Sequence, residues 1–162
     1  MGERAVTEFP VHPAVFADGS RVCADPRCAT LLPADAEICD ECGGIRLEPS
    51  DNALAMLCGW ADGRPVAFKL HPAGPTSIGR SAPGVAAPDI DLSRLPGSGS
   101  VHRRHATIEL RDGEWRVTQL GSNLLVVIGR DRVVVATGTT AAVRSGDLVD
   151  IGGVRLQLVV RI

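Results

Sequence analysis

Long apolar runs are absent from this 162-residue sequence, and aromatic side chains are scarce, with three phenylalanines, two tryptophans and no tyrosine. No run approaches the roughly 20 residues that a membrane-spanning helix needs, and the N-terminus lacks a basic-then-apolar signal segment. We therefore expect a protein that binds no membrane and stays in the cytoplasm. The shortage of aromatic residues also removes most of the stacking platforms that nucleic-acid-binding surfaces use.

Sequence signatures of catalysis are missing as well. Ser100, His102 and His105 lie near one another in the sequence, but no Asp-oriented base and no G-x-S-x-G turn accompanies them. The glycine-rich stretch Gly97-Ser98-Gly99 lacks the lysine and the spacing of a phosphate-binding P-loop. We therefore expect this protein not to be an enzyme.

The charges are unevenly distributed along the chain. Residues 1–52 carry four arginines against ten acidic residues, a net charge of −6, whereas residues 53–162 carry thirteen basic against nine acidic residues, a net charge of +4. This asymmetry indicates two modules with different roles. We expect a flexible tail at 1–18, a small module at 19–48, a polar linker at 49–52 and a larger domain at 53–162.

The small module contains four closely paired cysteines. Cys23 and Cys28 form a C-x4-C pair, and after ten intervening residues Cys39 and Cys42 form a C-x2-C pair followed by two glycines. Two such pairs complete a tetrahedral Zn²⁺ site, which is structural because four sulfurs leave no position for water. Two alternatives are disulfides, which a reducing compartment disfavours, and a redox C-x-x-C, which lacks a thioredoxin-like context.

These four cysteines make the segment resemble a zinc ribbon. Its roughly 25 residues bury too little apolar surface to fold alone, so we expect metal binding to supply the folding free energy.

The larger domain consists of short β-branched or alternating runs separated by Gly, Pro, Asp and Ser, and no stretch offers a capped helix of useful length. Ten strands are expected, at residues 53–60, 65–70, 76–80, 106–111, 114–119, 124–128, 132–135, 139–143, 147–151 and 154–160. Asp112-Gly113 and Gly152-Gly153 are expected hairpin turns. The predicted fold is all-β, an antiparallel β-sandwich of about ten to eleven strands, with Cys58 buried in its first strand.

Several motifs in this domain occur in an ordered series. They are Ser77-Ile78-Gly79-Arg80, Asp89-Ile90-Asp91-Leu92, the VHRRHA run at 101–106, Asp112-Gly113-Glu114-Trp115, Gln119-Leu120-Gly121-Ser122-Asn123 and the SGDLVDIG run at 145–152. In this order and spacing they resemble a forkhead-associated (FHA) domain over residues 53–162. The resemblance implies a β-sandwich whose loops at one end bind phosphothreonine peptides.

The resemblance also assigns roles to individual residues. Arg80 and Arg103 would hold the phosphate or the neighbouring peptide backbone, and Ser122 and Asn123 would add a hydroxyl and an amide from the third loop. Three residues would structure the loops: His105 would pin its loop from within through a ring nitrogen, and Gly79 and Gly121 would let the backbone turn close to the ligand.

Two positions depart from the family pattern. His102 stands where the family usually has serine, and Leu124 and Leu125 stand where the pattern continues with Gly-Thr. An imidazole donates with charge only when it is protonated, so His102 would contact phosphate differently from a serine hydroxyl. Three outcomes remain open: weakened phosphopeptide binding, phosphate-independent contacts, and binding that depends on pH.

The leading hypothesis is a non-enzymatic adaptor that recognises phosphothreonine on a partner protein, a Ser/Thr kinase or its substrate. One alternative is a degenerate FHA scaffold that makes phosphate-independent protein–protein contacts. Another is nucleic-acid binding by the zinc ribbon, against which its acidic character argues, since phosphate contacts would be unfavourable.

Overall fold

The computed structural model describes residues 20–50 and 53–161. The tail expected at 1–18 lies outside the described residues, as do positions 51–52 of the expected linker. The N-terminal part forms a three-stranded antiparallel sheet in the order β2-β1-β3, with β1 at Arg21–Cys23, β2 at Leu31–Leu32 and β3 at Leu47–Pro49. We call residues 20–50 the cysteine module.

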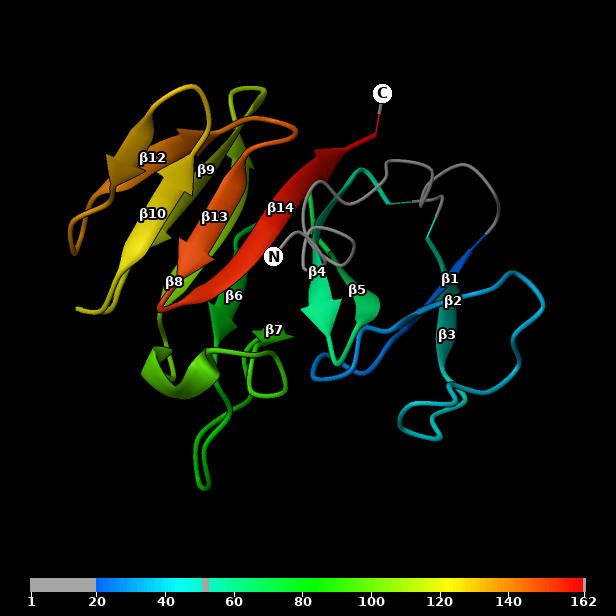
Figure 1. Ribbon diagram of the computed structural model, residues 1–162. Coiled ribbons are helices and arrows are strands. Elements are labelled where there is room, and N and C mark those ends of the chain that lie inside the picture. Colours follow the sequence, from blue (N-terminus) through cyan, green and yellow to red (C-terminus); the bar gives the residue numbers. More distant parts are fainter. Residues whose placement is uncertain (1–19, 51–52, 162) are drawn as a thin grey trace, which may run out of the picture.

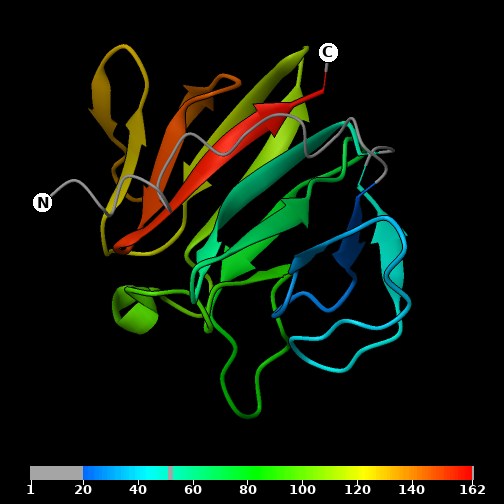
Figure 2. The same cartoon turned by 45° about the vertical axis from the view of Figure 1, so that its right-hand side comes forward.

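The larger domain is a sandwich of two sheets (Figures 1 and 2). The six-stranded sheet has the order β11-β10-β13-β14-β4-β5 and the five-stranded sheet the order β12-β9-β8-β6-β7. The bounds are β4 Ala55–Ala61, β5 Arg64–Lys69, β6 Thr76–Gly79, β7 Ile90–Asp91, β8 Ala106–Arg111, β9 Glu114–Gln119, β10 Leu125–Ile128, β11 Arg132–Val134, β12 Thr140–Val143, β13 Leu148–Ile151 and β14 Val154–Val160. The predicted all-β sandwich is confirmed.

One strand was not among the expected ten. β7 has only two residues, too few for a period to be visible in the sequence, and it pairs with β6 in parallel, with Gly79 opposite Asp91. All other strand pairs among the described residues are antiparallel. The sandwich therefore has eleven strands, the upper end of the predicted range.

Tight turns set the register of the hairpins. Asp112 and Gly113 have φ values of 54° and 76°, and Gly152 and Gly153 have 57° and 102°, so both expected turns use the left-handed region that two-residue hairpins require. A third turn of this type, Asp62-Gly63 with φ values of 53° and 77°, joins β4 to β5 and was not singled out from the sequence.

The core lies between the two sheets and is almost entirely aliphatic. β4 and β14 cross its centre, where Leu57, Cys58, Leu156 and Leu158 are fully buried. Burial raises the pKa of the Cys58 thiol to about 12, which keeps it protonated and inert, as expected for a small core residue.

The cysteine module packs against one edge of the sandwich beside β5 and β7 (Figure 2). Thr30 forms a β-bridge with Val66, and the Ala67 backbone N–H donates to the Ala29 carbonyl oxygen at 2.9 Å. Val22 and Ala29 belong to the same apolar cluster as the sandwich core. The two modules therefore share part of one core.

The expected boundary between the two modules lies near the end of β3, which continues to Pro49. Ser50 is buried and its hydroxyl donates to the Ser20 carbonyl oxygen at 2.8 Å. The division at 48 and 53 stays a prediction. In the part of the chain that the structure describes, no helix has the length and apolar character needed to cross a bilayer.

Candidate functional site

Three loops meet at one end of the sandwich, the lower end in Figure 1. They follow β6, precede β8 and follow β9. The Arg80 backbone N–H donates to the His102 carbonyl oxygen at 3.1 Å, which ties the first loop to the second. A Cβ at Gly79 would collide with the Arg103 carbonyl oxygen, so this glycine is required because another loop lies against it.

A shallow hollow of about 380 Å³ opens on this end. It is lined by His102, Arg103, Arg104, Leu120, Gly121, Ser122 and Thr137. Its basic side chains have no acidic partner: among the described residues, Arg103 and Arg104 form no ion pair. The hollow is therefore a solvent-open place where an anion meets uncompensated positive charge.

The His102 ring lies between the second and third loops. Its Nε2 and the Ser122 hydroxyl oxygen are 3.2 Å apart. A Cβ at Gly121 would lie 2.5 Å from His102 Cδ2, so the absence of a side chain at Gly121 makes room for the imidazole. The imidazole at position 102 therefore fits closely against the loop that follows β9.

His105 is fully buried and holds both loops through its ring. Nδ1 accepts from the His102 backbone N–H at 3.1 Å, and Nε2 lies 3.0 Å from the Leu124 carbonyl oxygen. Because a carbonyl only accepts, these partners select the neutral tautomer with hydrogen on Nε2. Burial lowers the pKa of His105 below its ordinary value, the Leu124 carbonyl opposes this shift, and the nearby His102 adds to it.

Two of the predicted phosphate-binding residues are placed differently from the others. Arg80 starts from the same end of the sandwich but is not among the residues that line the hollow. Asn123 lies beside the hollow, and its side-chain amide donates to the Ser100 carbonyl oxygen at 2.7 Å. The structure brings His102, Arg103 and Ser122 together in the hollow, whereas Arg80 and Asn123 are not among the residues that line it.

Sequence reasoning missed three residues of the hollow. Arg104 follows Arg103 directly, so a run of two arginines could have suggested it. Leu120 is 48% exposed beside Gly121 and supplies an apolar wall. Thr137 comes from the loop between β11 and β12, and its hydroxyl donates to the Gly121 carbonyl oxygen at 2.6 Å; nothing in the sequence places that loop here.

The four cysteines of the module form one cluster, with all four sulfurs within 4.8 Å of one another. The Cys23 and Cys42 sulfurs are 3.6 Å apart, as are those of Cys28 and Cys39. A disulfide would need about 2.05 Å, and all four thiols are free. Sulfurs about 2.3 Å from a tetrahedral Zn²⁺ lie about 3.8 Å apart, so the spacing fits a metal.

The backbone around Cys39 favours the thiolate form of that residue, whereas the net pKa of the Cys42 thiol lies above its ordinary value. The Gly43 backbone N–H donates to the Cys39 carbonyl oxygen at 2.7 Å, and Gly43 has a φ of 78°, which suits glycine at this turn. Burial raises the pKa of the Cys39 thiol, but the backbone N–H groups of Cys42 and Glu41 lower it, and the net pKa lies below the ordinary value.

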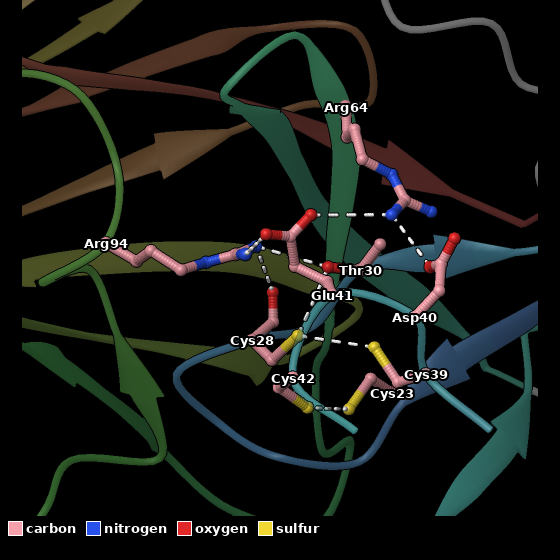
Figure 3. A network of polar contacts seen from close by, with 9 residues as sticks. All are labelled: Cys23, Cys28, Thr30, Cys39, Asp40, Glu41, Cys42, Arg64 and Arg94. Carbon is pink, nitrogen blue, oxygen red and sulfur yellow. Dashed lines mark hydrogen bonds and ion pairs between the residues drawn. The ribbon is translucent and has the colours of Figure 1, made fainter. Parts of the chain in front are cut away.

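The two residues between Cys39 and Cys42 connect this cluster to the sandwich (Figure 3). Arg64 Nη1 lies 2.8 Å from an Asp40 carboxylate oxygen and 3.4 Å from one of Glu41, and Arg94 Nη1 lies 3.3 Å from the other Glu41 oxygen. Arg94 Nη2 donates to the Cys28 carbonyl oxygen at 3.0 Å. Glu41 thus bridges two sandwich arginines, while Arg94 also reaches the first cysteine pair.

Comparison with known proteins identifies the sandwich. Residues 76–152 match the family model of the FHA domain, so the chain contains an FHA domain. This family is known for recognising phosphopeptides in signalling, and its domains are generally non-enzymatic. No curated protein matches the chain.

Solved structures share the fold. A Mycobacterium tuberculosis EmbR structure, in complex with a low-affinity phosphopeptide, is 24% identical with a TM-score of 0.50 over 78% of this chain and 27% of that one. The FHA domain of an Arabidopsis thaliana hypothetical protein is 18% identical with a TM-score of 0.50 over 67% and 85%. The human APLF FHA domain, in complex with an XRCC1 bisphospho peptide, is 20% identical with a TM-score of 0.47 over 66% and 98%.

Proposed function

We propose that the loop end of the sandwich binds phosphothreonine peptides, and that the protein is a non-enzymatic adaptor in Ser/Thr kinase signalling in the cytoplasm. Its partner is a phosphorylated kinase or a kinase substrate. The observation that carries this proposal is the open hollow in which Arg103 and Arg104 lie without acidic partners beside His102 and Ser122. A guanidinium matches phosphate oxygens with a planar, permanently charged fork.

Each group has a distinct role in this proposal. Arg103 and Arg104 attract and hold the phosphate, and the Ser122 hydroxyl turns from His102 to donate to a phosphate oxygen. Arg80 holds the phosphate from the margin or contacts the peptide backbone next to it, and Asn123 does the same from the third loop. The proposal includes no covalent step, because binding needs only preorganised donors.

The direct experiment compares phosphorylated and unphosphorylated versions of the same threonine peptides, drawn from a degenerate library, by calorimetry. We expect the protein to bind only phosphorylated members. Arg103→Ala should lower the affinity roughly ten- to a hundredfold, since a charge-assisted hydrogen bond contributes about 1.5–3 kcal/mol. Arg130→Ala is the matched control, because Arg130 lies at the other end of β10 from the third loop. Equal binding of both peptide forms would refute the proposal.

A second candidate is a phosphate-independent protein–protein scaffold. Two observations favour it: the Ser122 hydroxyl is already paired with His102, and the Asn123 amide is already paired with Ser100. Both groups would exchange these partners to reach phosphate, which weakens binding. Arg80→Ala discriminates between the candidates, because partner capture that survives this substitution favours the scaffold, and lost capture favours phosphopeptide recognition.

We also propose that Cys23, Cys28, Cys39 and Cys42 hold a structural Zn²⁺, as in a zinc ribbon. The 3.6 Å sulfur separations and the backbone donors around Cys39 support this assignment. The ion would supply four bonds that join two loops of the module, and no position is left for water. One equivalent of zinc per chain, lost in Cys39→Ser and retained in Cys58→Ala, is the expected result.

A further inference from the structure

A buried carboxylate lies directly behind the first loop of the peptide-binding end. Asp91 of β7 is 3% exposed and pairs with Gly79, the residue before Arg80. One carboxylate oxygen accepts the backbone N–H of Ser81 at 3.2 Å and that of Ser93 at 3.0 Å, and the Ser93 hydroxyl also donates to it. Asp91 therefore fixes the backbone immediately after Arg80.

The cysteine module contacts this carboxylate from the other side. The Asp91 backbone N–H donates to the Pro26 carbonyl oxygen at 3.1 Å, and Arg27 Nε lies 3.7 Å from the second Asp91 carboxylate oxygen. Arg27 Nη2 donates to the Ser81 hydroxyl at 3.1 Å. A single arginine thus contacts both the buried carboxylate and the residue that follows Arg80.

The loop that carries Arg27 is itself closed. It runs between Cys23 and Cys28, and the Arg27 and Cys28 backbone N–H groups donate to the side chain and the carbonyl of Asp25 at 2.9 and 3.0 Å. Arg27 is therefore presented to the sandwich from a turn whose two ends are drawn together by the cysteine cluster.

We infer that Arg27 is a positioning residue, through which the cysteine module sets the orientation of Arg80 at the peptide-binding end. This inference rests on the proposed function. The Arg27 side chain is 61% exposed while that of Asp91 is 4% exposed, so the ion pair itself is weak. The effect comes from geometry, because Ser81 and Asp91 hold the chain on both sides of Arg80, and a displaced guanidinium loses bidentate contact with phosphate.

The test uses the 162-residue chain purified with zinc, together with three variants. Arg27→Ala should lower the affinity for a phosphothreonine peptide by about two- to fivefold, which corresponds to an exposed charged contact. Arg27→Lys should recover part of the loss, because an ammonium group still reaches Asp91. Arg46→Ala is the matched control, since Arg46 is an exposed arginine of the same module, and it should bind as the unmodified protein does.

Amide hydrogen exchange gives a second readout that needs no ligand. In Arg27→Ala the Ser81 and Ser93 amides should exchange faster, while the zinc content stays unchanged. Unchanged exchange together with unchanged affinity would overturn the inference. Faster exchange with unchanged affinity would also overturn the inference, because Arg27 would then stabilise the loop without affecting peptide binding. If the unmodified protein binds no phosphothreonine peptide, the proposed function fails, and the exchange result still decides whether Arg27 holds the loop.

Discussion

The two modules are stabilised by different kinds of contact. The sandwich has long paired strands such as β4 and β14, of seven residues each, around a large aliphatic core. The cysteine module has strands of two or three residues, and its own buried cluster consists of Cys23, Cys28, Cys39 and Leu32. Cysteine side chains thus make up most of the buried cluster of the cysteine module, whereas aliphatic side chains such as leucine and valine make up most of the sandwich core.

This difference shows how a module of about thirty residues folds when its apolar area is too small. Three contributions would stabilise it: the Zn²⁺ proposed between the cysteines, the shared core at Val22 and Ala29, and the polar contacts of Arg64 and Arg94 with Asp40 and Glu41. The following experiments separate these contributions.

Metal removal should have the largest effect. Chelation, or Cys39→Ser, should unfold the cysteine module with a loss on the order of 10 kcal/mol, the range found for structural zinc in small domains. The sandwich should keep most of its amide signals in NMR spectra, because its core contains none of the four ligands. A cysteine module that stays protected from amide exchange after complete chelation would show that packing alone stabilises it.

A cavity in the sandwich core is the converse test. Leu158→Ala removes a fully buried side chain of β14 and should cost about 2–5 kcal/mol in the free energy of unfolding, measured with denaturant. Zinc content of the folded protein should not change. The control Val134→Ala, at a side chain that is 63% exposed, should shift stability by less than about 0.5 kcal/mol. Loss of zinc from folded Leu158→Ala would show that the cysteine cluster depends on packing in the sandwich core as well as on its own contacts.

Arg94→Ala should weaken the connection between the modules. Its side chain is 22% exposed and contacts Glu41, the Cys28 carbonyl and the Thr30 hydroxyl, so we expect a loss of about 1.5–3 kcal/mol. Thermal unfolding should then resolve two transitions. Arg64→Ala is a graded comparison, because its partner Asp40 is 72% exposed and such pairs contribute about 0–1 kcal/mol. Equal losses of unfolding free energy in Arg94→Ala and Arg64→Ala would mean that burial does not decide how strongly these arginines connect the modules.

The smallest expected effect is a dependence of sandwich stability on pH. His105 has a pKa lowered by burial from its ordinary 6.5, so the unfolded chain binds its proton first as the pH falls. Its contribution to stability is complete above pH 6.5 and is lost as the pH falls through the lower pKa of the folded protein. An NMR titration of the His105 ring should give a midpoint below pH 6.5. A midpoint at or above that value would contradict a neutral imidazole that forms a hydrogen bond at each ring nitrogen.

Much of the fold could be predicted from local patterns. Alternating runs predicted β8, β9 and β14 with the bounds that the structure has, and Asp112-Gly113 predicted its hairpin. These features depend on neighbours in sequence, which a pattern reports directly. β7 escaped detection because two residues have no period, and it exists only because β6 lies beside it.

The sequence by itself determined the sandwich, the grouping of the four cysteines, and the cluster of His102, Arg103 and Ser122, because each is encoded by residues close together or by an ordered series of motifs. Tertiary structure alone decided that Thr137 lines the hollow while Arg80 does not, and that Arg94 reaches Cys28 across 66 positions of the chain. Contacts at such separations depend on how loops meet once the strands have paired, and no local period records that geometry.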